Sequence, residues 1–363
     1  MYSLLLVIFA AAAVSLLLTP LCRAASHACG LLDKPDFTRK VHSIPTPRIG
    51  GFPIVVAYLA AYAVLGFSHL RGVAVLHENI VLARAVLPAA ALIFLVGLID
   101  DIFTLRPWQK FAGQILAALL AFHSGVQFTT LAGHAFPVWL DLPITVIWLV
   151  GCCNAFNLID GVDGLAAGVG LFATITMLIA ALLQHNMGLA LATAPLAAAL
   201  LGFLPYNFNP ASIFLGDCGS LVIGFLLGSY GILWSHKSTT ILGLTAPLMA
   251  LSIPLLETGL SILRRALARK PIFGADRGHI HHRLLDRGFT PRHVALLLYA
   301  VCGLSAAFSL VCSFQERIAG PIVVLFAAVT WAGIHSLGYA EFADLRDKFR
   351  SKSTREHRKG AAA

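Results

Sequence analysis

Two carboxylates and two amides stand in a short stretch between long apolar runs. The stretch reads NAFNLIDGVDGLAAG, residues 154–168, and holds Asn154, Asn157, Asp160 and Asp163. Polar side chains within a membrane segment indicate a functional site, because each of them costs free energy in hydrocarbon. If the segment is helical, the spacing of three residues from Asn154 to Asn157 to Asp160 places these side chains on adjoining parts of one face.

Further acids lie at the ends of other apolar runs. Asp100 and Asp101 follow ALIFLVGLI directly, and Asp217 lies in FLGDCGS. Adjacent carboxylates repel each other unless a divalent cation, Lys or Arg offsets them, and a solvated helix end is the alternative for the pair. The carboxylates of these acids and of Asp160, together with the Asn amide oxygens, are hard oxygen ligands that suit Mg²⁺ or Mn²⁺. Phosphate oxygens would complete the coordination shell of the metal. The acids therefore predict a metal–phosphate site.

A histidine-rich segment, RKPIFGADRGHIHHRLLDRG, follows later in the chain. It holds His279, His281, His282 and Arg283. Imidazole and guanidinium donors close together suit a diphosphate. A zinc site is the weaker interpretation, because no Cys or Glu ligand is near, and an anionic-lipid patch explains the arginines but not the three histidines.

Three glycines and Glu257 each have both a functional and a structural interpretation. Gly161, Gly164 and Gly168 let the backbone approach a ligand, and close helix packing explains Gly164 and Gly168 equally well. Glu257 lies inside PLLETGLSILRR. An acid within a membrane segment is a functional candidate, and a structural salt bridge is its alternative.

The elements that must position these residues are membrane helices. Of the 363 residues, 58% are hydrophobic and only 12% are charged, against about 25% in soluble domains. We predict an all-α polytopic bundle of about eleven spans, the fifth of which continues into the Asn/Asp stretch, with a hairpin or interfacial loop at 126–143. The spans lie near 2–20, 49–68, 80–99, 109–125, 143–153, 164–183, 187–204, 219–235, 242–263, 292–312 and 318–338.

Basic residues set the expected orientation. All of the 26 Lys and Arg residues fall on the side of the motifs except Arg71, Arg84, Lys237 and Arg317. This asymmetry makes the motif loops cytoplasmic and places the N-terminus outside. It also explains the net charge of +9, so we expect no nucleic-acid partner. We divide the chain into a membrane domain, 1–340, and a charged, partly disordered cytoplasmic tail, 341–363.

Five ordered motifs resemble those of the polyprenyl-phosphate N-acetylhexosamine-1-phosphate transferase family. They are HSIPTPRIGG, the DD pair, NAFNLIDGVDGLAAG, FLGDCGS and HIHHRL, and the likeness covers roughly residues 30–290. The resemblance implies transfer of a sugar 1-phosphate from a UDP-sugar to a polyprenyl phosphate, with release of UMP. It also implies Mg²⁺ as the cofactor and a bacterial inner-membrane enzyme that begins synthesis of a cell-envelope polysaccharide such as O-antigen or teichoic acid.

The resemblance also assigns residues by position. Asp100 and Asp101 match the acidic pair that engages the lipid phosphate, and they are the implied catalytic residues. Asn157 and Asp217 match the metal ligands. Thr104 stands where some members of the family carry a third acid, so we do not include position 104 in the predicted site. The implied substrate-binding residues are Lys110, Asn154, Asp160, Asp163, His279, His281, His282 and Arg283.

The substrates follow from the same resemblance. HIHHRL preceded by FGADRG favours UDP-GlcNAc over UDP-MurNAc-pentapeptide, while FucNAc or QuiNAc donors stay open. The expected partners are undecaprenyl phosphate, the UDP-sugar and membrane lipids, and a homodimer is left open. A phosphomonoester has a second pKa of about 6, so the acceptor needs little deprotonation at neutral pH. Three roles for Asp100 stay open. It acts as a base toward the minor fraction of lipid phosphate that keeps its second proton, it positions a substrate, or it forms a covalent aspartyl-phosphate.

A secondary transporter is the opposing hypothesis. Transporters also place polar residues and broken helices in the bilayer, but near its midplane and with inverted repeats. Here the polar clusters lie on one side, and the two halves of the sequence show no inverted similarity. The pattern therefore favours an enzyme.

Overall fold

The computed structural model describes residues 1–33, 45–78, 80–128, 130–131, 134–135, 137–235, 248–267, 269, 278–314 and 316–336. Two short antiparallel hairpins in these ranges join β1 (Leu32–Asp33) to β2 (Thr46–Pro47) and β3 (Thr130–Leu131) to β4 (His134–Ala135). The helices are α1 (Tyr2–Cys29), α2 (Gly51–Gly66), α3 (Gly72–Glu78), α4 (Ile80–Phe103), α5 (Pro107–His123), α6 (Val138–Ile159), α7 (Leu165–Leu183), α8 (Met187–Asn207), α9 (Asp217–Ser235), α11 (Ser252–Leu267), α12 (Ile280–Asp286), α13 (Pro291–Phe314) and α14 (Glu316–Ser336).

Eight of the described helices are long and apolar enough to cross a membrane: α1, α4, α6, α7, α8, α9, α13 and α14. The other expected spans, near 49–68, 109–125 and 242–263, coincide with the shorter helices α2, α5 and α11. Residues 242–247 lie outside the described ranges. The all-α, multi-pass membrane class is confirmed, whereas the number of eleven spans and the orientation stay predictions.

Several predicted boundaries can be compared directly with the helices. The fifth span runs on into the Asn/Asp stretch as expected, because α6 includes Asn154 and Asn157 and ends at Ile159, and the loop after α5 contains the β3–β4 hairpin. The first helix is longer than predicted and reaches Cys29, where Gly30 ends it in a left-handed conformation (φ 70°). The tail from 341 lies outside the described residues.

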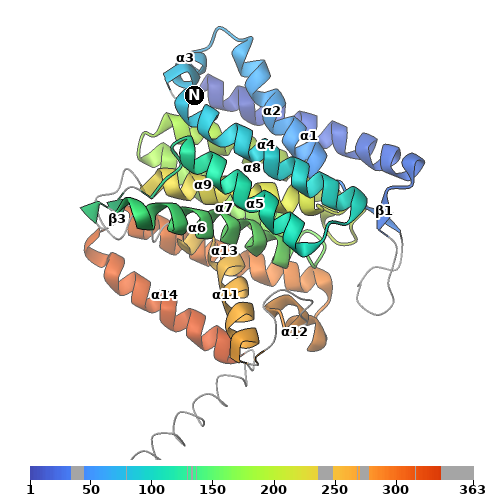
Figure 1. Ribbon diagram of the computed structural model, residues 1–363, viewed down its shortest axis with the longest axis vertical. Coiled ribbons are helices and arrows are strands. Elements are labelled where there is room, and N and C mark those ends of the chain that lie inside the picture. Colours follow the sequence, from blue (N-terminus) through green and yellow to red (C-terminus); the bar gives the residue numbers. More distant parts are fainter. Residues whose placement is uncertain are drawn as a thin grey trace, which may run out of the picture.

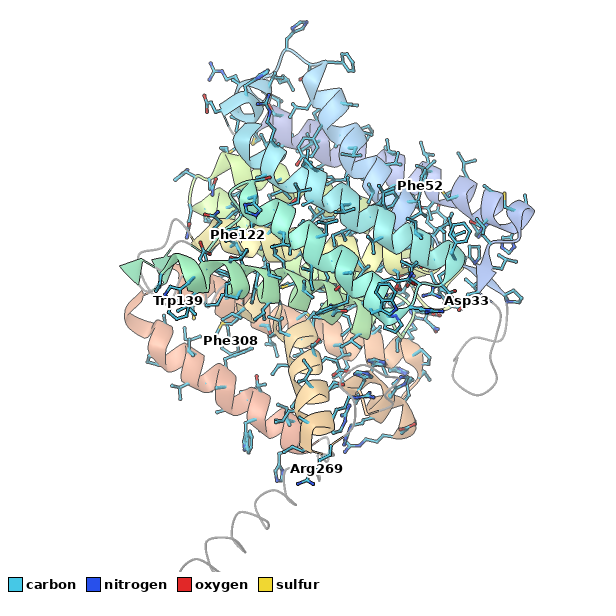
Figure 2. The ribbon with its side chains drawn as sticks, viewed as in Figure 1. Asp33, Phe52, Phe122, Trp139, Arg269 and Phe308 are labelled. Carbon is cyan, nitrogen blue, oxygen red and sulfur yellow. The ribbon has the colours of Figure 1, made fainter. Side chains whose placement is uncertain are left out.

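The described helices run back and forth, so their turns collect at two ends (Figure 1). One end carries β1, α12 and the turn between α4 and α5, and the opposite end carries β3 and the N-terminus. Figure 2 shows Asp33 at the first end and Trp139 at the second. The described parts of all five sequence motifs lie at the first end, which is called the site end below.

The helix at the centre of the bundle is α9, which packs against α2, α4, α6 and α7. Its glycines permit this close packing, since a Cβ on Gly224 would lie 2.3 Å from the carbonyl oxygen of Cys152 on α6. Because Asp217 is the first residue of α9, the most enclosed helix of the bundle presents this acid at the site end.

A tyrosine hydroxyl compensates for a proline inside α8, and a second tyrosine binds the next carbonyl. Pro195 has no backbone N–H, so the carbonyl of Leu191 has no partner within the helix. Tyr62 on α2 donates to this carbonyl oxygen at 3.1 Å, and Tyr230 on α9 donates to that of Ala192 at 3.2 Å. Water cannot replace the lost hydrogen bond within a membrane. The two hydroxyls therefore link α2 and α9 to α8 through hydrogen bonds.

We expect Tyr62→Phe to lower the free energy of unfolding in mixed micelles by about 1 kcal/mol, the size of a buried polar contact between membrane helices. The cost should fall in a Pro195→Ala background, because alanine restores the N–H that Leu191 lacks. A double-mutant cycle over the four proteins measures this coupling. Equal costs of Tyr62→Phe in the two backgrounds would contradict the explanation.

Candidate active site

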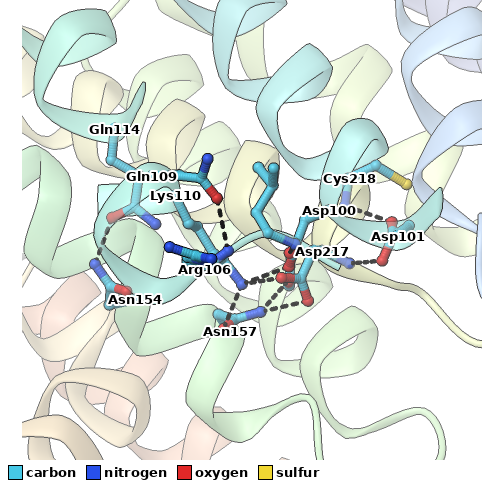
Figure 3. Close-up of polar contacts among 12 residues, drawn as sticks. Asp100, Asp101, Arg106, Gln109, Lys110, Gln114, Asn154, Asn157, Asp217 and Cys218 are labelled. Carbon is cyan, nitrogen blue, oxygen red and sulfur yellow. Dashed lines mark hydrogen bonds and ion pairs between the residues drawn. The ribbon is translucent and has the colours of Figure 1, made fainter. Parts of the chain in front are cut away.

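Four helices bring four predicted site residues into contact at the site end (Figure 3). Nζ of Lys110 on α5 lies 3.3 Å from Oδ2 of Asp100 on α4 and 3.2 Å from Oδ1 of Asn157 on α6, and it also contacts Oδ2 of Asp217 on α9. Asn157 donates from Nδ2 to Oδ1 of Asp217 at 2.9 Å. These four residues, Asp100, Lys110, Asn157 and Asp217, are called the acid–lysine cluster below.

Asp101 caps the central helix. Its Oδ1 accepts from the backbone N–H of Asp217 at 2.8 Å, and its Oδ2 accepts from that of Cys218 at 2.9 Å. The first N–H groups of a helix have no partner within it and carry partial positive charge, so a carboxylate there is stabilising. The Asp101 side chain is fully buried, and Nε of Arg48 lies 3.4 Å from Oδ1. Asp101 therefore fixes the start of α9, and with it Asp217.

Asp100 faces the cluster, unlike its neighbour. Its Oδ1 accepts from the backbone N–H of Leu105 at 2.6 Å and thereby shapes the turn between α4 and α5. Its Oδ2 points to Lys110. The two adjacent acids thus have different surroundings, because one caps α9 and the other has an oxygen in the acid–lysine cluster.

Sequence reasoning missed three residues that hold this arrangement together. Arg48 pairs with Asp101 and lies 3.2 Å from Oδ1 of Asp217. Gly216 has φ +73°, and a Cβ there would lie 2.0 Å from the carbonyl oxygen of Arg48. A Cβ on Gly97 of α4 would lie 2.6 Å from the backbone of Asp217. The motifs around Arg48 and Gly216 were visible in the sequence, whereas the roles of these residues depend on contacts between distant segments.

Two predicted substrate-binding residues are occupied by contacts within the protein. Asn154 donates from Nδ2 to Oε1 of Gln114 on α5 at 2.6 Å. Asp163 accepts at Oδ2 from Nδ2 of Asn209 at 2.9 Å and from the backbone N–H of Ala211 at 3.0 Å. These bonds position α6 against α5 and fix the loop after α8. A direct substrate contact for either residue stays a prediction.

Asp160 follows α6 and lies close to the charged groups of the site. Burial raises the pKa of its carboxyl well above the usual range, while the charge of Arg48 lowers it and the charges of Asp101 and Asp163 raise it. A carboxyl in such surroundings is stabilised in its ionised form by any cation that approaches it. A hydrogen bond from the backbone of Gly216, which precedes α9, also lowers this pKa, so Asp160 lies beside the start of the central helix.

The histidine segment meets the Asn/Asp stretch. His279 and His281 are buried, and a Cβ on Gly161 would lie 2.8 Å from Nε2 of His281. The ring of His282 lies 4.4 Å from that of His281, measured between centroids, and Arg283 donates from Nε to a backbone carbonyl of its own segment at 3.0 Å. The structure thus places His281 against the loop that follows Asn157.

Two of the predicted glycines serve helix packing. The hydroxyl of Tyr299 on α13 donates to the carbonyl of Gly164 at 2.5 Å, and a Cβ on Gly168 would lie 2.1 Å from this hydroxyl. Tyr299 fills the space that the missing side chain leaves. For these two positions, helix packing is the explanation that the contacts support.

The donors in the acid–lysine cluster fit a magnesium ion. Asp217 offers a carboxylate and Asn157 an amide oxygen, and the Lys110 ammonium already bridges these two groups as a cation. The described residues form no group of three or more His, Cys, Asp or Glu side chains that could hold a metal ion. Mg²⁺ is often held by one or two protein ligands together with waters and substrate phosphates, and Asp217 and Asn157 offer two oxygen ligands of this kind.

Fold and site together define a polytopic membrane protein with acidic, basic and amide side chains in contact at one end of its helices. The model of glycosyl transferase family 4 matches residues 83–235, which include the whole acid–lysine cluster. The chain is 33% identical over 292 residues to a probable undecaprenyl-phosphate N-acetylglucosaminyl 1-phosphate transferase of Bacillus subtilis, covering 79% of this chain and 78% of that protein. It therefore belongs to the polyprenyl-phosphate N-acetylhexosamine-1-phosphate transferase family.

Two further relatives bear on the branch of the family. A decaprenyl-phosphate N-acetylglucosaminephosphotransferase of Mycobacterium tuberculosis is 34% identical over 333 residues, which cover 82% of this chain and 80% of the relative. A phospho-N-acetylmuramoyl-pentapeptide-transferase of Latilactobacillus sakei is also 34% identical, but over only 217 residues, 58% of this chain and 63% of the relative. The similarity to the N-acetylglucosamine enzymes thus extends over more of the chain.

Proposed function

We propose that the protein transfers N-acetylglucosamine 1-phosphate from UDP-GlcNAc to undecaprenyl phosphate, releasing UMP and forming a lipid-linked diphosphate sugar. The observation that carries this proposal is the acid–lysine cluster, in which side chains from four helices meet at one end of a membrane bundle. The names of the relatives support the choice of sugar and lipid. The reaction would begin synthesis of a cell-envelope polysaccharide at the bacterial inner membrane.

Each residue of the cluster has a task in this reaction. Asp217 and Asn157 would hold Mg²⁺, or Mn²⁺, which when bound neutralises charge on the diphosphate. Lys110 binds phosphate oxygens with its ammonium group and offsets the repulsion between the lipid phosphate and the donor. Oδ2 of Asp100 lies next to Lys110 in the acid–lysine cluster, where it is placed to accept the second proton of the lipid phosphate. Asp101 and Arg48 hold Asp217 in position.

The activity is tested with purified protein, UDP-GlcNAc and undecaprenyl phosphate, by following UMP. We expect UMP release only when both substrates and Mg²⁺ are present. A transporter instead predicts movement of a solute across vesicles without UMP. Replacing the donor with UDP-linked FucNAc, QuiNAc or MurNAc-pentapeptide identifies the sugar, because faster release from one of these would contradict the choice of UDP-GlcNAc.

The proposed orientation places the site end in the cytoplasm, with the N-terminus outside. Cys29 lies at the site end and is exposed, whereas Cys22, Cys152, Cys153, Cys218, Cys302 and Cys312 are buried. A membrane-impermeant maleimide should therefore label Cys29 in inside-out vesicles and not in right-side-out vesicles. Cys29→Ser is the control for labelling at other sites, and the opposite pattern would refute the orientation.

A further inference from the structure

A single buried carboxylate joins α11 to the histidine segment. Glu257 is 2% exposed, and its Oε1 accepts from the backbone N–H of Ile280, the first residue of α12, at 2.7 Å. Nδ1 of His279 and Nδ1 of His281 each lie 3.4 Å from the same oxygen. The two imidazole rings are parallel, with an angle of 2° between their planes. Glu257 thus fixes both the start of α12 and the orientation of two histidines.

The position of Glu257 determines which nitrogen of each histidine ring is left for another partner. A carboxylate removed from water is stable only when a positive or hydrogen-bonding partner compensates it. Within the described residues, the ion-pair partners of Glu257 are the two imidazoles. Because Nδ1 of each ring faces Glu257, Nε2 is the ring nitrogen that remains for another partner.

The free side of His281 faces the site loop. Its Nε2 is buried and has no hydrogen-bond partner among the described residues. A Cβ on Gly161 would lie 2.8 Å from this nitrogen, so Nε2 lies directly against the loop between Asp160 and Asp163. A buried ring nitrogen without a partner costs free energy unless a ligand completes it. A ligand with acceptor oxygens, such as a phosphate, matches an N–H at this position.

We infer that Glu257 is a positioning residue, which holds His281 so that its Nε2 donates to the phosphate groups of the nucleotide sugar. This inference rests on the proposed function, since it takes UDP-GlcNAc as the ligand. Glu257 is 2% exposed and shares its Oε1 among Ile280, His279 and His281, so we assign it a role through His281 and not a direct contact with the substrate.

Binding of phosphorylated and unphosphorylated ligands separates this role from a general structural one. Glu257→Gln keeps an acceptor oxygen for Ile280 but removes the charge. We expect it to weaken binding of UDP-GlcNAc and UMP about tenfold, the loss of one charge-assisted hydrogen bond, and to leave uridine binding unchanged. Isothermal titration of the purified full-length protein in micelles measures all three affinities.

A second variant tests the same contact from the loop. Gly161→Ala places a methyl group against Nε2 of His281 and should also weaken UMP binding while sparing uridine. The matched control is Gly259→Ala on α11, where a Cβ meets no atom within 4 Å, and its affinities should equal those of the wild type.

Three outcomes overturn the inference. The first is equal loss of UMP and uridine binding in Glu257→Gln, which indicates a structural role. The second is unchanged UMP binding in both Glu257→Gln and Gly161→Ala. The third is a wild-type protein that binds no UDP-GlcNAc, in which case the proposed function fails as well. In the first two outcomes the wild type still binds the nucleotide sugar, so the proposed function is unaffected.

Discussion

Asp217→Ala should abolish UMP release, with a loss of about a thousandfold or more, while the protein still folds and inserts. The substitution removes the carboxylate that contacts Lys110, Asn157 and Arg48, and it leaves Lys110 without its partner on α9. Loss of one preorganised electrostatic group at a reacting phosphate costs about 10²–10³ in rate, and loss of a metal ligand adds to this. Binding of Mn²⁺, followed by electron paramagnetic resonance, should weaken in parallel.

Asp141→Asn is the matched control for Asp217→Ala. Asp141 is also a buried aspartate, but it lies in the first turn of α6 at the opposite end of the bundle, where its Oδ1 accepts from Thr145 at 3.1 Å. Asparagine can keep that hydrogen bond, so turnover and Mn²⁺ binding should stay at the wild-type level. An Asp217→Ala variant with normal Mn²⁺ affinity would remove Asp217 from the metal site.

The two adjacent acids should respond differently to the same substitution. Asp101→Asn should lower both Tm and turnover, with a loss of about 3 kcal/mol in stability, because asparagine offers one acceptor where the N–H groups of Asp217 and Cys218 need two. Asp100→Asn should keep Tm close to the wild-type value, since its oxygen can still accept from Leu105, but lower turnover about a hundredfold. Thermal unfolding and UMP release measure the two effects.

The pH dependence of Asp100→Asn identifies what Asp100 does. As a base it is needed most near pH 6, where the lipid phosphate keeps part of its second proton, so activity should partly recover by about pH 8 to 9. A deficit that is constant with pH indicates a positioning role, and a trappable phosphoenzyme in the wild type indicates a covalent aspartyl-phosphate. If instead Asp101→Asn proves stable and Asp100→Asn unfolds, the assignment of the two roles is wrong.

The sequence was sufficient to predict the membrane class and the residues of the acid–lysine cluster. Polar residues in apolar runs are visible by type alone, so Asp100, Asn157 and Asp217 could be chosen before their contacts were known, whereas Lys110 was chosen from the resemblance. The resemblance to a family assigned their roles. The continuous helix α6 was also predictable, because the Asn/Asp stretch contains no proline and follows directly on an apolar run.

The different roles of Asp100 and Asp101 could not be predicted. Successive residues of a helix point about 100° apart, and the face that meets α9 depends on how closely Gly97 lets the two helices approach. The internal bonds of Asn154 and Asp163 were hidden for the same reason, since their partners Gln114 and Asn209 come from other segments. Residue types indicate chemistry, whereas the partner of each side chain is set by tertiary packing.

The central claim is the transfer of a sugar phosphate, and the fate of the β-phosphate of the donor tests it most directly. The purified protein is incubated with undecaprenyl phosphate, Mg²⁺ and UDP-GlcNAc labelled with ³²P at the β position, and the lipid and aqueous fractions are counted. We predict that the label enters the lipid fraction while an equal amount of unlabelled UMP is released. Release of labelled UDP, with a lipid that carries sugar but no label, would show transfer of the sugar alone and contradict the proposed reaction.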